Sequence, residues 1–129
     1  MAAAFGIEKA GRLSGTVAVP GDKSLSHRSI MLAGLADTPV EVHNFLAAED
    51  CLSTVSCMRA LGVSVEFDPD GKVLVKGKGL YGLNEPDDVL DAGNSGTTIR
   101  LLSGLLAGQT FFTVLTGDDS LRRRAMARI

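Results

Sequence analysis

The residues best suited to chemistry stand together near the start of the chain, in the stretch GDKSLSHR at residues 21–28. Asp22 is a favourable N-cap for a helix, so Lys23 and Ser24 would lie in the first turn. Arg28 follows Ser24 by one turn on the same face. An ammonium, a hydroxyl, a guanidinium and unpaired backbone N–H groups would then gather at one helix N-terminus, which favours phosphate or carboxylate binding. A capped surface helix with solvated charges explains the octet equally well, and it is not a P-loop because the preceding glycines are missing.

A second stretch, DAGNSGTTIR at residues 91–100, repeats this arrangement. Asn94 or Ser95 can cap the helix that follows, and Gly96 leaves the backbone open to a ligand. Arg100 lies one turn further along and can either face that ligand or pair with Asp91. Plain helix capping is again the simpler alternative.

A third stretch, GDDSLRRR at residues 117–124, begins another expected helix. Arg124 follows Ser120 by four residues, which is the spacing of Ser24 and Arg28, so Arg124 is the arginine that we expect to face inward. Arg122 and Arg123 point in other directions and fit a solvated face. Parallel helices would thus direct three N-termini at one pocket, whose ligand should carry several negative charges.

Composition limits the alternatives. A chain of 129 residues with 45% hydrophobic and 22% charged residues fits one soluble domain. The net charge of −2 and the lack of tryptophan argue against a nucleic-acid partner. Cys51 and Cys57 form neither a metal pair nor a redox motif, so we expect buried thiols in a reducing compartment. No signal peptide and no membrane-spanning run are recognised, so we expect a cytoplasmic protein without a membrane partner.

Hydrophobic periodicity predicts alternating strands and helices of an α/β (α+β) fold. We expect helices over 23–36, 49–61 and 94–107, the start of a fourth after residue 120, and strands over 13–19, 40–43, 63–67, 72–76, 90–92 and 110–116. Leu25, Leu32 and Leu35 recur at roughly helical spacing in the first helix. The order suggests two βαβ-type units, of which the second is incomplete.

The three stretches GDKSLSHR, LDAGNSGTTIR and GDDSLRRR, in this order and spacing, resemble the 5-enolpyruvylshikimate-3-phosphate (EPSP) synthase family. The resemblance implies transfer of the enolpyruvyl group from phosphoenolpyruvate to shikimate 3-phosphate, before chorismate in the shikimate pathway, with no metal or organic cofactor. It implies a fold of βαβαββ units in two domains around a cleft. Residues 1–20 would supply a strand to the other, C-terminal domain, and residues 21–129 would form part of the N-terminal, substrate-binding domain.

The resemblance also implies roles for individual residues. Lys23 would contact both substrates and is the one catalytic residue that it assigns here. Ser24 and Arg28 would hold shikimate 3-phosphate, with Arg28 on its carboxylate.

At the other stretches, Gly96 would leave room for phosphoenolpyruvate, and Arg124 would bind the anionic groups of that ligand. Asn94 and Thr97 would contribute contacts from the same turn. Glyphosate occupies the phosphoenolpyruvate place in the family, and a glycine at position 96 resembles the sensitive form. Ala125 departs from the proline that usually follows the last arginine, so we expect a looser entry to that helix.

The family's acidic proton-transfer residues lie beyond the portion that this chain resembles, so we expect activity only together with a C-terminal fragment of the enzyme. Two other hypotheses stay open. The chain can be a non-catalytic fragment that binds anions, or part of a sister enolpyruvyl transferase acting on a UDP-sugar, which the DKSxSxR pattern disfavours.

Overall fold

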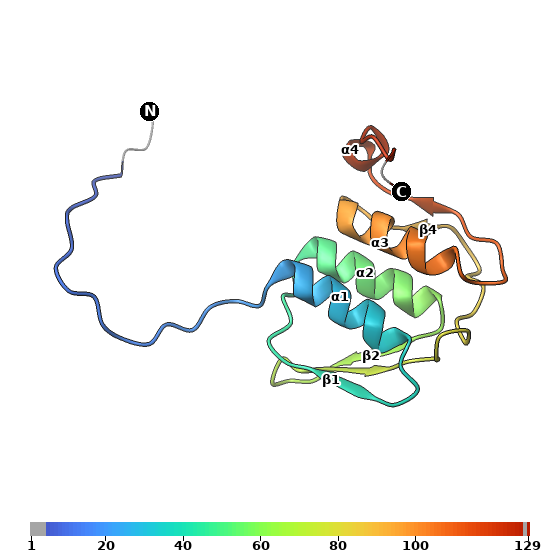
Figure 1. Cartoon of the computed structure of the whole chain (residues 1–129), viewed down its shortest axis with the longest axis horizontal. Coiled ribbons are helices and arrows are strands. Elements are labelled where there is room, and N and C mark those ends of the chain that lie inside the picture. The colour runs from blue at the N-terminus through green and yellow to red at the C-terminus, as the bar shows by residue number, and fades with distance from the viewer. Residues whose placement is uncertain (1–4, 128) are drawn as a thin grey trace.

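Helices and strands alternate along the chain in the computed structural model, which describes residues 5–127 and 129 (Figure 1). In chain order the elements are α1 (Lys23–Gly34), β1 (Val40–Val42), α2 (Glu49–Ala60), β2 (Ser64–Phe67), β3 (Val73–Lys76), β4 (Leu90–Asp91), α3 (Gly96–Leu106), β5 (Leu115–Thr116) and α4 (Asp119–Arg122). The predicted mixed α/β class and the predicted order of these elements are confirmed.

The larger sheet has the strand order β1-β3-β2. Its middle strand runs antiparallel to both neighbours, and Val75 pairs with Val40 on one side and with Val65 on the other. The β2–β3 hairpin turns at Asp68, whose carbonyl accepts a hydrogen bond from the N–H of Gly71 at 3.1 Å. Gly71 has a φ of 80°, a conformation that glycine adopts without strain. The predicted hairpin is therefore confirmed.

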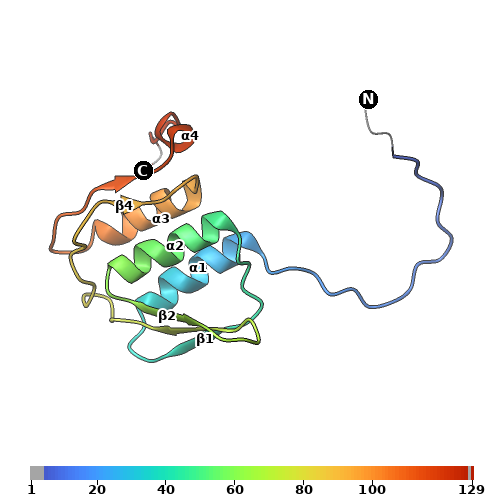
Figure 2. The same cartoon turned by 180° about the vertical axis from the view of Figure 1, so that it is seen from behind.

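Helices α1 and α2 pack side by side on this sheet, and α3 contacts both of them on the side away from it (Figure 2). The parallel pair β4–β5 borders α2 and α3, so the helices lie between two small sheets. The shared core contains Ile30, Val55, Met58, Leu61, Val73, Val75 and Leu102, all of which are almost completely buried. This packing leaves the N-terminal ends of the helices together at one end of the helical layer.

The buried face of α1 differs from the predicted one. Leu25 and Leu32 are 67% and 68% exposed, whereas Ser26, His27, Ile30, Met31, Ala33 and Gly34 face the interior. Gly34 lies on this buried face, where a Cβ atom would meet the terminal methyl of Met58 and, at 3.2 Å, a methyl of Val63. A helix approaches its neighbour most closely on its small residues, and this approach outweighs the burial of two leucines.

Two predicted strands are wrong in whole or in part. Residues 13–19 form no strand, and the segment 5–20 extends away from the helices and sheets in both views (Figures 1 and 2). A strand needs backbone partners, and no described residue outside this segment makes a backbone hydrogen bond with it. The strand predicted over 110–116 shrinks to β5, because its partner β4 offers only two residues, with Leu90 opposite Leu115.

Within the described ranges, every helix falls short of the length and apolarity that crossing a bilayer would require.

Candidate anion-binding site

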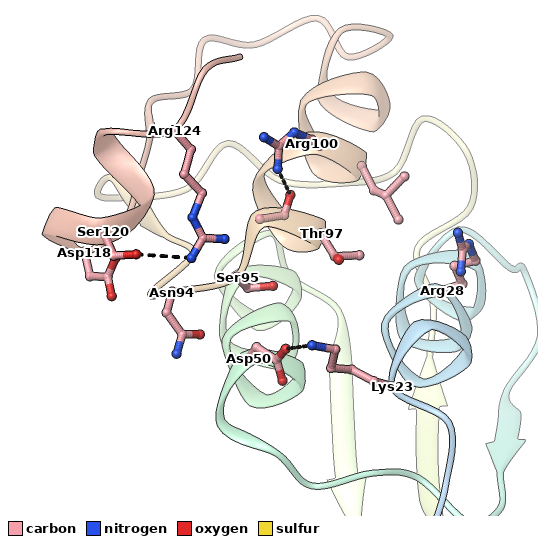
Figure 3. A pocket seen from close by; sticks show the side chains of 12 residues that line it. Lys23, Arg28, Asp50, Asn94, Ser95, Thr97, Arg100, Asp118, Ser120 and Arg124 are labelled. Carbon is pink, nitrogen blue, oxygen red and sulfur yellow. Dashed lines mark hydrogen bonds and ion pairs between the residues drawn. The ribbon is translucent and has the colours of Figure 1, made fainter. Parts of the chain in front are cut away.

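A pocket of about 710 Å³ lies where the helices begin (Figure 3). The residues that line it are Lys23, Arg28, Asp50, Asn94, Ser95, Gly96, Thr97, Arg100, Leu101, Asp118, Ser120 and Arg124. They come from the first turns or caps of α1, α2, α3 and α4 and from Asn94 just before the α3 N-cap, together with the following turns of α1 and α3 and the residue after the α4 C-cap. The predicted convergence of helix N-termini on one pocket is confirmed, and the start of α2 also borders the pocket, which was not predicted.

The α1 entry, residues 22–28, is capped as predicted, since a carboxylate oxygen of Asp22 accepts a hydrogen bond from the N–H of Leu25 at 2.7 Å. The ammonium of Lys23 lies 3.1 Å from a carboxylate oxygen of Asp50 in the first turn of α2. Burial by itself would raise the pKa of Asp50, but the hydrogen bond and the charge of Lys23 outweigh it, so this pKa is lowered. Lys23 and Asp50 therefore form an ion pair at the edge of the pocket.

Arg28 stands one turn deeper on α1. Its guanidinium donates a hydrogen bond of 3.3 Å to the backbone carbonyl of Ser24, and the residue lines the pocket from the α1 side (Figure 3). The side chain of Ser24 is exposed and does not line the pocket.

The α3 entry, residues 94–100, presents backbone rather than acids. Ser95 is the N-cap, because its hydroxyl accepts a hydrogen bond from the N–H of Thr98 at 3.1 Å. A Cβ atom built on Gly96 would lie 2.7 Å from a guanidinium nitrogen of Arg100 and 3.2 Å from one of Arg124. The absence of a side chain at Gly96 therefore leaves the space into which two arginines reach.

Arg100 and Arg124 are held by neutral groups. Arg100 donates to the carbonyl of Gly96 at 3.2 Å and to that of Ala125 at 3.1 Å, so of the two alternatives left open for it, the pairing with Asp91 is not the one observed. Arg124 donates to the hydroxyl of Ser120 at 3.1 Å. Helix α4 is a single turn, and Arg124 follows it rather than belonging to it.

The balance of charge identifies the kind of ligand. Among the residues that the structure describes, Arg28, Arg100 and Arg124 make no ion pair with a carboxylate. The lining has four cationic side chains against two carboxylates, one of which is already paired with Lys23. Unpaired guanidinium groups beside helix N-termini are suited to phosphates and carboxylates.

A divalent cation fits this site poorly. One donor atom each of His27, Asp50 and Cys51 lies within 4.8 Å of the others. However, the Lys23 ammonium already binds Asp50, and burial raises the pKa of Cys51 to about 11, which disfavours the thiolate that a metal needs. The carboxylate of Asp50 is thus better described as the partner of Lys23 than as a metal ligand.

Six of the seven predicted site residues line the pocket, namely Lys23, Arg28, Asn94, Gly96, Thr97 and Arg124. Sequence reasoning missed Asp50 as a lining residue, because an acid in a first helical turn also suits the helix dipole. The one sequence signal for it was the start of the helix predicted over 49–61, which places Asp50 in the first turn of that helix. Asp118 was missed for the same reason, since it caps α4 by accepting from the N–H of Leu121 at 2.7 Å.

Comparison with known proteins decides the family. A sequence model described as EPSP synthase (3-phosphoshikimate 1-carboxyvinyltransferase) matches residues 7–129. The chain belongs to the EPSP synthase family.

EPSP synthase relatives support this at the level of sequence and of structure. The 3-phosphoshikimate 1-carboxyvinyltransferase of Pelotomaculum thermopropionicum is 58% identical over 123 residues, which are 95% of this chain and 28% of the relative. That of Herpetosiphon aurantiacus is 57% identical, with the same coverage. The structure of EPSP synthase from Acinetobacter baumannii matches with a TM-score of 0.84 and 49% identity over 88% of this chain and 26% of that one.

The chain therefore spans about 28% of the length of these curated EPSP synthases. Its elements form an incomplete part of the family fold, with α1, β1, α2 and the β2–β3 hairpin in one unit and β4, α3, β5 and α4 in the next.

Proposed function

We propose that this protein supplies the N-terminal part of an EPSP synthase active site, which transfers the enolpyruvyl group of phosphoenolpyruvate to shikimate 3-phosphate with release of phosphate. One observation carries the proposal: the α1 and α3 entries share a pocket with three arginines that have no acidic partner among the described residues. Both substrates combine a phosphate with a carboxylate, so together they supply the negative charge that this lining lacks.

On the α1 side we assign shikimate 3-phosphate to Arg28 and Ser24. A guanidinium can bind a carboxylate through two parallel hydrogen bonds, and Arg28 uses only one weak contact to the carbonyl of Ser24. The side chain of Lys23 extends from the α1 entry toward Asp50 (Figure 3). When a ligand anion replaces Asp50 as its partner, its ammonium can reach both substrates. Lys23 is therefore our candidate for the catalytic residue of this chain.

On the α3 side we assign phosphoenolpyruvate to the space left by Gly96. The guanidinium of Arg124 borders that space. The N–H groups of Gly96 and Thr97 at the start of α3 can donate to an anion, whereas that of Thr98 already donates to Ser95. Asn94 and Thr97 line the same turn and would add contacts. Glyphosate, as a competitor for this place, would meet the same groups.

The rest of the site would come from the remaining length of the enzyme. In this proposal residues 1–20 join the C-terminal domain, which suits the exposed apolar side chains of Leu13, Val17 and Val19. Residues 21–129 form part of the N-terminal domain, and the acids that move protons come from the C-terminal portion. We infer a cytoplasmic location from the two buried cysteines, which are both free.

Complementation tests the proposal directly. The chain is mixed with the remaining C-terminal portion of the Pelotomaculum thermopropionicum relative, and phosphate release from phosphoenolpyruvate is measured with and without shikimate 3-phosphate. We expect release that needs both protein pieces and both substrates. A correctly assembled mixture without such activity would refute the proposal.

A second candidate function is that of a fragment that binds anions without catalysing a reaction. The pocket favours it, because described residues of this chain form its lining without a second chain. Isothermal titration of the chain with shikimate 3-phosphate, phosphoenolpyruvate and, as a control, UDP-N-acetylglucosamine separates the cases. Binding of shikimate 3-phosphate without restored activity favours the second candidate. Preferential binding of the UDP-sugar would contradict both.

A further inference from the structure

His27 is a buried polar side chain directly behind the pocket. It is 0% exposed, and its Nδ1 atom lies 2.6 Å from the hydroxyl oxygen of Thr54 on α2. That oxygen lies 2.7 Å from the hydroxyl oxygen of Thr98 on α3, which in turn donates to the hydroxyl of Ser95 at 2.6 Å. A continuous buried chain of hydrogen bonds therefore connects the α1 entry to the N-cap of α3.

The direction of this chain follows from counting protons. Each threonine hydroxyl has one proton to donate. Thr98 gives its proton to Ser95, so in its contact with Thr54 it must accept. Thr54 then gives its proton to Thr98 and must accept from His27. The Nδ1 atom of His27 therefore carries a hydrogen.

The other ring nitrogen of His27 is left without a partner. Its Nε2 atom is buried and makes no hydrogen bond within the described part of the chain. It lies 3.8 Å from the same carboxylate oxygen of Asp50 that is 3.1 Å from the ammonium of Lys23. An unpaired buried acceptor is costly, and a group with several N–H donors beside it would satisfy it.

Burial is the main reason that the ring favours its neutral form. Burial lowers the pKa of His27, and the charges of Lys23 and Arg28 lower it further, whereas the charge of Asp50 and hydrogen bonding of a protonated ring to its carboxylate raise it; the pKa is lowered overall. A neutral ring with hydrogen on Nδ1 has a lone pair on Nε2. The Asp50 oxygen that lies 3.8 Å from Nε2 also binds the Lys23 ammonium, which has three donors.

We propose that His27 is a positioning residue: the hydroxyls of Thr54, Thr98 and Ser95 hold it as the neutral Nδ1–H tautomer, so that its Nε2 lone pair and Asp50 together orient the Lys23 ammonium. This chain of hydrogen bonds from His27 to Ser95, which we call the relay, ends at the N-cap of α3, so it links the two halves of the pocket. The part that concerns ligands rests on the proposed function, because it assumes that Lys23 meets the substrates.

The tautomer can be observed directly by NMR. In the uniformly ¹⁵N-labelled chain at neutral pH, a long-range ¹H–¹⁵N spectrum separates protonated from unprotonated ring nitrogens. We expect His27 to show a protonated Nδ1 and a bare Nε2. A protonated Nε2, in either the neutral or the cationic ring, would overturn the proposal.

Thr98→Val tests the relay. It keeps the shape of the side chain but removes the acceptor of the Thr54 proton, so Thr54 becomes free to donate to Nδ1. We expect His27 to change to the Nε2–H tautomer, and we expect Thr98→Ser, which keeps the hydroxyl, to retain Nδ1–H. Thr38→Val, in an exposed loop, is the matched control and should change nothing. A folded Thr98→Val chain that keeps Nδ1–H would refute the relay, and Ser95→Ala makes the same test if that variant does not fold.

Binding gives a second, separable measurement. Titration with shikimate 3-phosphate should show an affinity about three- to tenfold lower for Thr98→Val than for wild type, the equivalent of one oriented hydrogen bond, and recovery in Thr98→Ser. Unchanged affinity in a Thr98→Val chain whose tautomer has changed would refute the role in orienting Lys23. If the wild-type chain binds neither substrate, the proposed function fails, while the NMR result still decides the tautomer.

Discussion

The α1 and α3 entries border the same pocket but present their charge differently. At α1 the cation Lys23 is already paired with Asp50, and its side chain is 57% exposed. At α3 the lining consists of backbone around Gly96, with Arg100 and Arg124 held by carbonyl and hydroxyl oxygens. A ligand that contacts Lys23 must replace a carboxylate, whereas a ligand at α3 meets donors that no acid has neutralised. The α1 side should therefore depend on single side chains, and the α3 side on the space between them.

Lys23→Ala should give the largest effect and would test the dependence of the α1 side on one group. Losing a charge-assisted contact that the assembled enzyme shields from water costs about 2–5 kcal/mol, so where the C-terminal portion covers Lys23, complemented activity should fall about 30-fold or more. Circular dichroism should show an unchanged fold. Lys72→Ala, which removes a lysine paired with Asp68 at the hairpin, should leave activity unchanged. Wild-type turnover by the Lys23→Ala enzyme would contradict the assignment.

Gly96→Ala would test the importance of space on the α3 side. The added methyl group would displace the ends of Arg100 and Arg124, and such crowding costs about 1–3 kcal/mol. We expect titration calorimetry to show weaker binding of phosphoenolpyruvate, with the affinity for shikimate 3-phosphate retained. Gly104→Ala is the matched control on the same helix, since its Cβ would meet no atom within 4 Å. An equal loss for both ligands would show that the two halves are not separate.

The two N-caps should differ in their contribution to stability. Ser95 is buried and accepts from the N–H and the hydroxyl of Thr98, whereas exposed Asp22 accepts one bond from the N–H of Leu25. Urea denaturation should show Ser95→Ala lowering the free energy of unfolding by about 2 kcal/mol and Asp22→Ala by about 1 kcal/mol. Equal losses would mean that burial of the α3 cap adds nothing.

Acid should weaken the fold through the α1 side. Because burial lowers the pKa of His27 below its ordinary value of 6.5, the unfolded chain takes up a proton first as the pH falls. The free energy of unfolding should be highest above about pH 6.5 and then decline by up to about 1.4 kcal/mol per pH unit until the folded ring titrates. His27→Asn should remove this decline in chemical denaturation, while His43→Asn, at an exposed position, should not. A pH-independent wild type between 6.5 and 5 would contradict this.

The parts of the fold that local chemistry controls could be predicted from the sequence. Asp22 caps α1, Gly71 turns the hairpin, and Gly62, with a φ of 88°, follows the end of α2 as predicted. The convergence of Lys23, Gly96 and Arg124 on one pocket was also predictable, because each of the three stretches combines a helix-capping residue, small residues and a following arginine.

The parts that depend on tertiary packing could not be predicted in this way. Leu25 and Leu32 are exposed because small residues on the opposite face allow α1 to approach α2. The strand over 13–19 was predicted from its own alternation, which does not reveal whether a backbone partner is present. Asp50 reads as a dipole-compensating acid until Lys23 is seen beside it.

Gly21 has a practical consequence for handling the protein. A methyl group there would collide with the carbonyl of Asn44, so the chain is pressed against the loop after β1 immediately before α1 begins. Residues 5–20 carry exposed side chains and lie outside that contact. Limited proteolysis should therefore trim the chain back to this glycine and stop, leaving a shorter piece that keeps the whole pocket and is better suited to crystallisation.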